Sequence, residues 1–118
     1  MGERPERKRE NPAAPVHNLV TYVAKKGKED ELAALVKKHE PALRKVGLVT
    51  EEPFKVWKAF NIRTGESSIV EMFTWKDGTA SDVAHQTPEV MAVWEPMGPI
   101  MEGMEIAAIE PVGARAKR

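Results

Sequence analysis

A histidine next to a predicted helix start is the feature of this sequence that most directly suggests chemistry. In the stretch AHQTPEVMAVW, residues 84–94, His85 stands two residues before Thr87 and Pro88. Threonine is a favoured N-cap residue and proline is favoured at the first helical position, so a helix should begin at Pro88. The chain before Thr87 must then form an irregular turn. An imidazole projecting inward from such a turn could act as a general base or bind a phenol hydroxyl.

His85 has two possible roles, and they predict different positions. If His85 is catalytic, its ring faces a cavity between the helices and the sheet. If His85 is structural, its ring closes the break before Thr87, for example by bonding to a backbone carbonyl. We take His85 as the candidate catalytic residue and expect it to face a cavity.

The cavity predicted beside His85 would be lined mainly by aromatic rings and other large apolar side chains. Such a lining suits a small aromatic ligand, and methionine makes the lining adaptable in shape. The alternative is that most of these side chains simply form the core and the dimer interface. The candidate substrate-binding residues are Trp75, Val90, Met91, Trp94, Asn18 and Tyr22.

The histidine spacing and the missing motifs argue against a bound metal or cofactor. His17, His39 and His85 show no ligand spacing and no clustered carboxylates, and the chain has no cysteine. His17, at the start of a predicted strand, and His39, beside Pro41, are weaker candidates for chemistry than His85. The sequence has no phosphate-binding glycine loop, dinucleotide fingerprint or Ser-His-Asp order. We therefore expect neither a metal nor a cofactor.

Glu71 is unusual because it alternates with two large apolar residues, Ile69 and Phe73, in a predicted strand. If its side chain faces inward it needs a partner, because burying an unpaired carboxylate is costly. Lys58, on the neighbouring predicted strand, is the candidate for that partner.

Length and composition are typical of one globular domain. The chain has 118 residues, of which 42% are hydrophobic and 31% are charged. No apolar run approaches the roughly 20 residues of a membrane span, and the N-terminus lacks the apolar core of a signal peptide. We expect a cytoplasmic protein that does not bind a membrane.

Charge is balanced over the whole chain, with 18 basic and 18 acidic residues, but it is unevenly distributed. Basic residues gather at both ends and leave an acidic body. This argues against nucleic-acid binding, which requires a basic surface. Three prolines and no apolar pattern predict an arm outside the fold at 1–15. We expect the folded domain to span 16–113 and a basic tail to span 114–118.

Four segments of the sequence have the pattern of β-strands. They are rich in β-branched and aromatic residues and are bounded by turn residues. The second and third are separated by Thr64-Gly65-Glu66, which predicts a hairpin. The four segments are 17–24, 53–63, 67–76 and 104–112.

Two regions have the periodicity of amphipathic helices. The first, from 29 to 46, should bend or break near Pro41, because proline cannot donate to the carbonyl four residues earlier. The second should start near Thr79, restart at Thr87 and end at Gly103.

The predicted order is strand, helix, strand, strand, helix, strand. This is the ferredoxin-like βαββαβ arrangement, an α+β fold in which two helices cover one face of a four-stranded antiparallel sheet. Strands 53–63 and 67–76 carry large residues on both faces. The face without helices therefore also needs a cover. The simplest cover is a second copy of the chain, which predicts a homodimer.

Together with this order, the segment EMFTWKDGTASDVAHQTPEVMAVWEPM, residues 71–97, resembles the antibiotic biosynthesis monooxygenase family of dimeric α+β barrels. The recognisable stretch of that family is a strand ending in Trp, a polar turn, and a helix with His before a Ser/Thr-Pro restart. The resemblance extends over about residues 17–112 in topology and implies that two sheets close face to face across a dimer. In this chain the pattern is occupied by Trp75, His85, Thr87 and Pro88.

The resemblance limits the possible reactions to a few classes but does not identify one of them. It implies a family that includes cofactor-free oxygenases of quinols and hydroxyaromatics, haem-degrading enzymes and small proteins of unknown role. The Asn, Trp and His of the haem-degrading members fall at Val20, Ala84 and Trp94 here, so haem degradation is disfavoured. The leading prediction is a cofactor-independent monooxygenase of a quinol or related hydroxyaromatic. The alternative is a non-enzymatic small-molecule-binding or stress-related dimeric α+β barrel protein.

Overall fold

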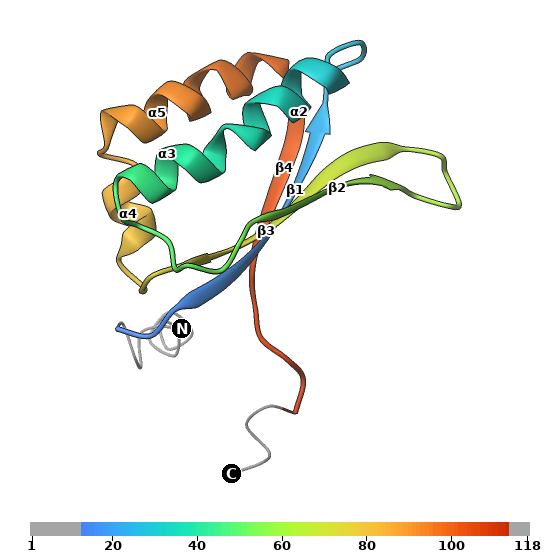
Figure 1. Cartoon of the computed structure of the whole chain (residues 1–118). Helices are drawn as coiled ribbons and strands as arrows, with labels where there is room; N and C mark the ends of the chain where they lie inside the picture. Colours follow the sequence, from blue (N-terminus) through green and yellow to red (C-terminus); the bar gives the residue numbers. More distant parts are fainter. Residues whose placement is uncertain (1–12, 114–118) are drawn as a thin grey trace, which may run out of the picture.

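One four-stranded antiparallel sheet, covered on one face by helices, forms the body of the protein (Figure 1). The computed structural model describes residues 13–113. The sheet order is β2-β3-β1-β4, which confirms the predicted ferredoxin-like α+β fold. Along the chain the elements are β1 (Val16–Ala24), α2 (Glu29–Lys37), α3 (His39–Lys45), β2 (Lys55–Phe60), β3 (Ser67–Trp75), α4 (Ala80–Ala84), α5 (Pro88–Trp94), the 3₁₀ helix η1 (Glu95–Ile100) and β4 (Met101–Ile109).

The two predicted end segments lie mostly beyond the part of the chain that the structure describes. Of the predicted arm, 1–15, residues 1–12 are outside the described residues, and so is the whole predicted tail, 114–118. β1 begins at Val16. Within 13–113, no helix is long and apolar enough to cross a membrane.

The first helical region is interrupted just before Pro41, as predicted. α2 ends at Lys37 and α3 begins at His39, so Pro41 lies in the first turn of α3. Proline is tolerated in a first turn, where backbone N–H groups have no intrahelical partner, but it is costly in a helix interior. The break therefore makes His39 the first residue of a new helix. Gly47, with a φ of 73°, follows the end of that helix.

The predicted hairpin is present, although β2 is shorter than expected. β2 and β3 pair antiparallel, with Phe60 opposite Ser67 at the loop end. The backbone N–H of Asn61 donates to the carbonyl of Glu66 at 2.8 Å and closes the loop. The hairpin projects beyond the helices (Figure 1). Because of this projection, Phe60 is 65% and Ile62 is 97% exposed.

The second helical region contains two short helices and a 3₁₀ turn. α5 starts at Pro88 after an extended Thr87, as predicted. β4 already starts at Met101, so the expectation that Gly103 ends the helical region is wrong. Gly103 instead pairs with Val23, where the register between β1 and β4 shifts. Glycine is common at such irregularities because it has no side chain to pack.

The core lies between the helices and one face of the sheet. Alternate strand residues point to this face, including Tyr22 of β1 and Phe73 of β3. They pack with fully buried helix residues, among them Leu32, Leu43 and Val90.

The opposite face of the sheet, which we call the open face, has no helix of the described residues over it (Figure 1). The strand registers show that apolar side chains from all four strands share this face. This group includes Leu19, Trp57, Val70, Met72 and Ala107.

Candidate functional site

Glu71, in the middle of β3, is fully buried in the core. Its exposed fraction is 0%, and it shares the helix-covered face with Ile69 and Phe73. Burying a carboxylate is tolerated only when hydrogen-bond donors replace the water it has lost. The surroundings of Glu71 therefore decide whether this part of the core is stable.

Two buried side chains donate hydrogen bonds to Glu71. The Tyr22 hydroxyl donates to Oε1 at 2.6 Å. The Nδ1 atom of His39 lies 3.2 Å from Oε1 and 3.0 Å from Oε2. Tyr22 and His39 are each 3% exposed, so bulk water does not compete with them for the carboxylate.

Trp94 extends these contacts and sets the tautomer of His39. Its indole Nε1–H donates to His39 Nε2 at 2.8 Å. An indole nitrogen can only donate, so His39 Nε2 accepts and carries no proton. The proton of the neutral ring is then on Nδ1, which donates it to Glu71. We call Trp94, His39, Glu71 and Tyr22 the Glu71 network.

Aromatic rings enclose the imidazole of His39. The ring centroids of Phe54, Phe73 and Trp94 lie 5.9, 5.3 and 5.6 Å from that of His39. Phe54 and Phe73 are stacked on each other at 4.8 Å. An apolar enclosure of this kind lowers the local dielectric constant and strengthens each polar contact inside it.

The four members of the Glu71 network come from four different elements. β1 and β3 are neighbours in the sheet, and their register puts Tyr22 opposite Ile69, two residues from Glu71 on the same face. His39 begins α3 because of the break before Pro41. Trp94 is the last residue of α5. The network therefore joins the sheet to both helical regions.

The Tyr22 hydroxyl is held in its protonated form. Burial, and next the negative charge of Glu71, raise the pKa of Tyr22 above its ordinary value. The hydrogen bond to Glu71 acts in the same direction. Tyr22 is consequently a lasting donor to Glu71 rather than an acid or base in its own right.

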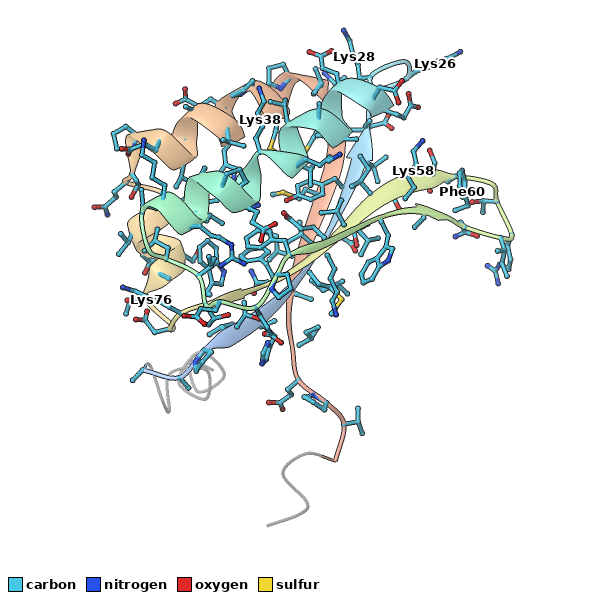
Figure 2. The ribbon with its side chains drawn as sticks, in the orientation of Figure 1. Lys26, Lys28, Lys38, Lys58, Phe60 and Lys76 are labelled. Carbon is cyan, nitrogen blue, oxygen red and sulfur yellow. The ribbon has the colours of Figure 1, made fainter. Side chains whose placement is uncertain are left out.

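The predicted pairing of Lys58 with Glu71 is wrong. The β2–β3 register places Lys58 opposite Ile69. Figure 2 shows Lys58 on the projecting hairpin, where the residue is exposed. Tyr22 and His39 satisfy the carboxylate instead. Neutral donors also avoid the cost of burying an ammonium group.

His85 is exposed, so the expectation that its ring faces an enclosed cavity is wrong. It forms the C-cap of α4, and its Nδ1 lies 2.8 Å from the carbonyl oxygen of Ser81. The same carbonyl also accepts the backbone N–H of His85 at 3.2 Å, so backbone and ring together hold the imidazole at the surface. The His85 ring also lies against Trp94, with 4.8 Å between centroids. His85 therefore touches the Glu71 network only from outside, through Trp94.

The structure divides the other predicted site residues between the network and the core. Tyr22 and Trp94 belong to the Glu71 network. Val90 is fully buried in the core, and Trp75 is 5% exposed at the end of β3. Met91 is half-buried on α5.

Sequence reasoning placed His39 below His85, yet His39 is the histidine that meets the buried carboxylate. A signal was present in the sequence. His39 continues the apolar helical stripe that contains Val36 and Leu43, just as Glu71 alternates with apolar residues along its strand. Two polar residues that both occupy buried faces are natural partners, because each needs the other to remain buried.

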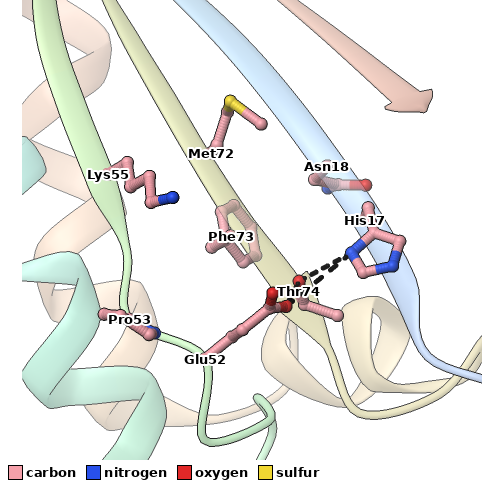
Figure 3. Close-up of a pocket in the computed structure, with 8 residues that line it drawn as sticks. All are labelled: His17, Asn18, Glu52, Pro53, Lys55, Met72, Phe73 and Thr74. Atoms are coloured by element: carbon pink, nitrogen blue, oxygen red, sulfur yellow. Dashed lines mark hydrogen bonds and ion pairs between the residues drawn. The ribbon is translucent and has the colours of Figure 1, made fainter. Parts of the chain in front are cut away.

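A small hollow, shown in Figure 3, opens towards the open face of the sheet, because His17, Met72 and Thr74 in its lining alternate with the buried residues of β1 and β3. Asn18, the remaining predicted site residue, is 8% exposed and lines this hollow together with Phe73. The volume of the hollow is about 80 Å³. A cavity of roughly 150 Å³ is needed to admit benzene, so the hollow is too small for an aromatic ring in this conformation.

Polar side chains occupy the rim of the same hollow. The Thr74 hydroxyl donates to Glu52 Oε1 at 2.9 Å and lies 2.9 Å from His17 Nδ1 (Figure 3). His17 and Glu52 supply too few ligands for a metal ion. Within 13–113, no group of three or more His, Cys, Asp or Glu side chains could hold a metal.

A second hollow, of about 290 Å³, lies near the loop end of the hairpin. Its lining includes Thr21 and Ser68, which alternate with the buried residues of β1 and β3 and so point to the open face. The sheet therefore separates this hollow from the Glu71 network. We regard the network as the better candidate site, because it alone joins a buried carboxylate to an imidazole.

Comparisons with known proteins identify the fold. No family model and no curated protein matches the chain. SnoaB, a cofactor-independent oxygenase from Streptomyces nogalater, is 12% identical with a TM-score of 0.65, over 84% of this chain and 94% of SnoaB. A structure described as an antibiotic biosynthesis monooxygenase is 11% identical with a TM-score of 0.62, over 81% of this chain and 97% of the other.

A dimeric protein of unknown function and ferredoxin-like fold from Bacteroides fragilis is 13% identical with a TM-score of 0.64, over 82% of this chain and 96% of the other. This chain has the antibiotic biosynthesis monooxygenase fold. The resemblance predicted from residues 71–97 is confirmed at the level of the fold. The Glu71 network lies between the helices and the sheet of this fold, and a shared fold does not fix the chemistry of these side chains.

Tyr22 should resist ionisation until the protein unfolds. It is the only tyrosine of the chain, so the ultraviolet absorbance of tyrosinate reports on it alone. Because the folded-state pKa is raised, its contribution to stability is present below the ordinary pKa of about 10 and is lost as the pH rises above that value. Alkaline titration followed by absorbance and circular dichroism should show ionisation and unfolding together. Guanidinium-unfolded protein, titrating at about pH 10, is the control. Ionisation at that pH with native circular dichroism would contradict the expectation.

Replacing Glu71 should destabilise the protein, and the loss of stability should be larger when both acceptor oxygens are removed than when one is kept. Glu71→Leu leaves the donors of Tyr22 and His39 without an acceptor and should lower the free energy of unfolding by about 2–5 kcal/mol. Glu71→Gln keeps one acceptor oxygen and should cost about 1–2 kcal/mol. Urea unfolding measures both. Glu51→Leu, at an exposed site, is the matched control and should change stability by less than about 0.5 kcal/mol. If Glu71→Leu and wild type have equal free energies of unfolding, the network does not contribute to stability.

Proposed function

We propose that this protein is a cofactor-independent monooxygenase acting on a quinol or related hydroxyaromatic compound. The observation that carries the proposal is the His39–Glu71 pair, with 3.0 Å between His39 Nδ1 and Glu71 Oε2 inside an aromatic enclosure. SnoaB, which shares the fold, is described as a cofactor-independent oxygenase. That description supports this class of reaction.

In the proposed reaction His39 is the general base. Glu71 accepts the hydrogen on Nδ1, so Nε2 on the other side of the ring is free of a proton and can take one from a phenol. The imidazolium that results is stabilised by the carboxylate behind it. The same division of roles operates in the carboxylate–imidazole pairs of serine hydrolases.

The substrate supplies the electrons in this proposal. A deprotonated hydroxyaromatic is electron-rich and can itself reduce dioxygen. One oxygen atom enters the product, and the other leaves as water with two hydrogens of the substrate, so no external reductant is required. The protein contributes a base, an apolar enclosure and donors near the anion. The proposed pocket keeps the substrate-binding residues expected from the sequence: Asn18, Tyr22, Trp75, Val90, Met91 and Trp94.

A non-enzymatic ligand-binding protein is the second candidate. The observation that favours it is the completeness of the internal hydrogen bonding. Among the described residues, no buried side-chain nitrogen or oxygen lacks a hydrogen-bond partner. A network satisfied in this way also serves to hold a core together, and a ligand that inserts beside it need not be transformed.

We also propose that the open face binds a second copy of the chain. Trp57 on this face is 49% exposed, and it is flanked by the half-buried Val70 opposite it on β3. Exposed aromatic and aliphatic side chains that adjoin one another favour a partner. The neighbour from Bacteroides fragilis is described as dimeric. Two sheets packed through their open faces would form the barrel that the resemblance implies.

Oxygen uptake with a panel of quinols and anthrones tests the enzymatic proposal. Purified protein without added cofactor should consume oxygen with at least one member of the panel. His39→Gln keeps a donor and an acceptor in the ring's position but has no titratable base, so it should lower turnover by roughly 10²–10⁴-fold. His85→Ala should lower it by much less, because His85 is exposed.

The outcomes of this experiment separate the candidates. If His85→Ala lowers turnover more than His39→Gln does, His85 and not His39 is the general base, as the sequence predicted. Ligand binding without oxygen uptake across the panel would favour the non-enzymatic candidate.

Sedimentation or light scattering tests the proposed dimer. Wild-type protein at micromolar concentration should be dimeric, and Trp57→Asp should shift it towards monomer by burying a charge in an apolar interface. Ile62→Asp, in the exposed hairpin loop, is the control and should remain dimeric. A wild-type monomer would exclude the dimer.

A further inference from the structure

We infer that Trp94 occupies the position of the ligand, and that a fused-ring hydroxyaromatic displaces it and donates its O–H to His39 Nε2. The indole N–H is then an internal substitute for the ligand's hydroxyl. The inference rests on the proposed function, because it takes His39 as the partner of the ligand. It adds the residue that must move and the class of ligand that can replace it.

The hydrogen-bonding capacity of His39 makes the exchange necessary. Its Nδ1 is committed to Glu71, and its Nε2 accepts from the Trp94 indole at 2.8 Å. A neutral imidazole has only one acceptor nitrogen. A ligand hydroxyl can therefore reach His39 only by replacing the indole. Because the new bond is of the same kind, the exchange leaves no buried group unpaired.

The position of Trp94 provides a route from the surface. Tyr22, His39 and Glu71 are buried, whereas Trp94 is half-buried. One side of its ring faces the buried His39, with 5.6 Å between centroids, and it also contacts the exposed His85 at 4.8 Å. Trp94 is thus the member of the network that separates His39 from solvent.

The backbone around Trp94 is suited to small movements. α5 ends at Trp94 and continues directly into η1, which contains Pro96 and Pro99. Prolines have no N–H to donate, and 3₁₀ hydrogen bonds have poorer geometry than those of an α-helix. The hydrogen-bond ladder is therefore weak on the C-terminal side of Trp94, and displacing its side chain breaks few backbone bonds.

The shape of the vacated space defines the ligand class. The hollow of about 80 Å³ opens towards the open face and offers no ring-sized space beside His39. Moving the indole would therefore open a slot the size of a fused bicyclic system, bordered by the rings of His39 and His85. Flat fused rings stack well on such a surface. A naphthol should therefore bind better than a single-ring phenol.

Binding of 2-naphthol to the full chain tests the inference. In ¹⁵N NMR spectra of wild-type protein, saturating 2-naphthol should shift the Trp94 indole N–H signal and speed its hydrogen exchange. His39 should keep its proton on Nδ1 or become protonated on both nitrogens. 2-Methoxynaphthalene has the same rings but no O–H to donate, and it should bind roughly three- to tenfold more weakly, the equivalent of one neutral hydrogen bond.

Trp94→Phe supplies a second measurement. It keeps an aromatic ring but removes the internal donor, so 2-naphthol should bind roughly three- to tenfold more tightly than to wild type. The same substitution in a His39→Phe background should give no gain, because the shared acceptor is gone. An unchanged affinity of Trp94→Phe overturns the inference. Should His39→Phe not fold, the wild-type spectra decide: a Trp94 indole signal that stays in place at saturation overturns it.

These readouts are independent of turnover. If 2-naphthol displaces Trp94 but the protein consumes no oxygen with any substrate, this inference stands and the monooxygenase proposal fails. If the protein consumes oxygen while the Trp94 indole stays hydrogen-bonded to His39, the monooxygenase proposal stands and this inference fails.

Discussion

The carboxylate of Glu71 is buried without access to water, and the packing of the helices on the sheet depends on satisfying it. An ionised carboxylate in an apolar core is tolerated only when donors reach it with good geometry. Here the donors come from β1 and α3, through Tyr22 and His39. Trp94 adds α5 by donating to the same imidazole. One acidic side chain thus constrains the relative positions of four elements.

The same contacts serve stability and chemistry at once. Holding Glu71 in the core requires that His39 keep its proton on Nδ1, and this requirement leaves Nε2 as an acceptor. A preorganised base needs that arrangement too, since its orientation must be fixed before the substrate arrives. The difference between a structural cluster and a working site then depends on access. In this fold Trp94 controls access, because it lies between His39 and the exposed His85.

The sequence predicted the parts of the fold that depend on local patterns. The order of strands and helices along the chain, the break before Pro41 and the start of α5 at Pro88 all follow from periodicity and from the chemistry of proline. The pairing of His39 with Glu71 could not be derived in this way, because it depends on how α3 lies over β3. The expected cavity at His85 failed for a local reason. The carbonyl of Ser81, one turn earlier, holds its ring at the surface.

The hydrogen bonds of the Glu71 network join residues that are far apart along the chain, with separations of 32, 49 and 55 residues. Closing such long loops costs conformational entropy before any contact compensates for it. The hairpin and the helices form from near neighbours, so we expect the network to form after them and after the folding transition state. Interactions absent from the transition state govern the rate of unfolding and hardly affect the rate of folding. On that expectation, this cluster affects how long the native state lasts more than how quickly it is reached.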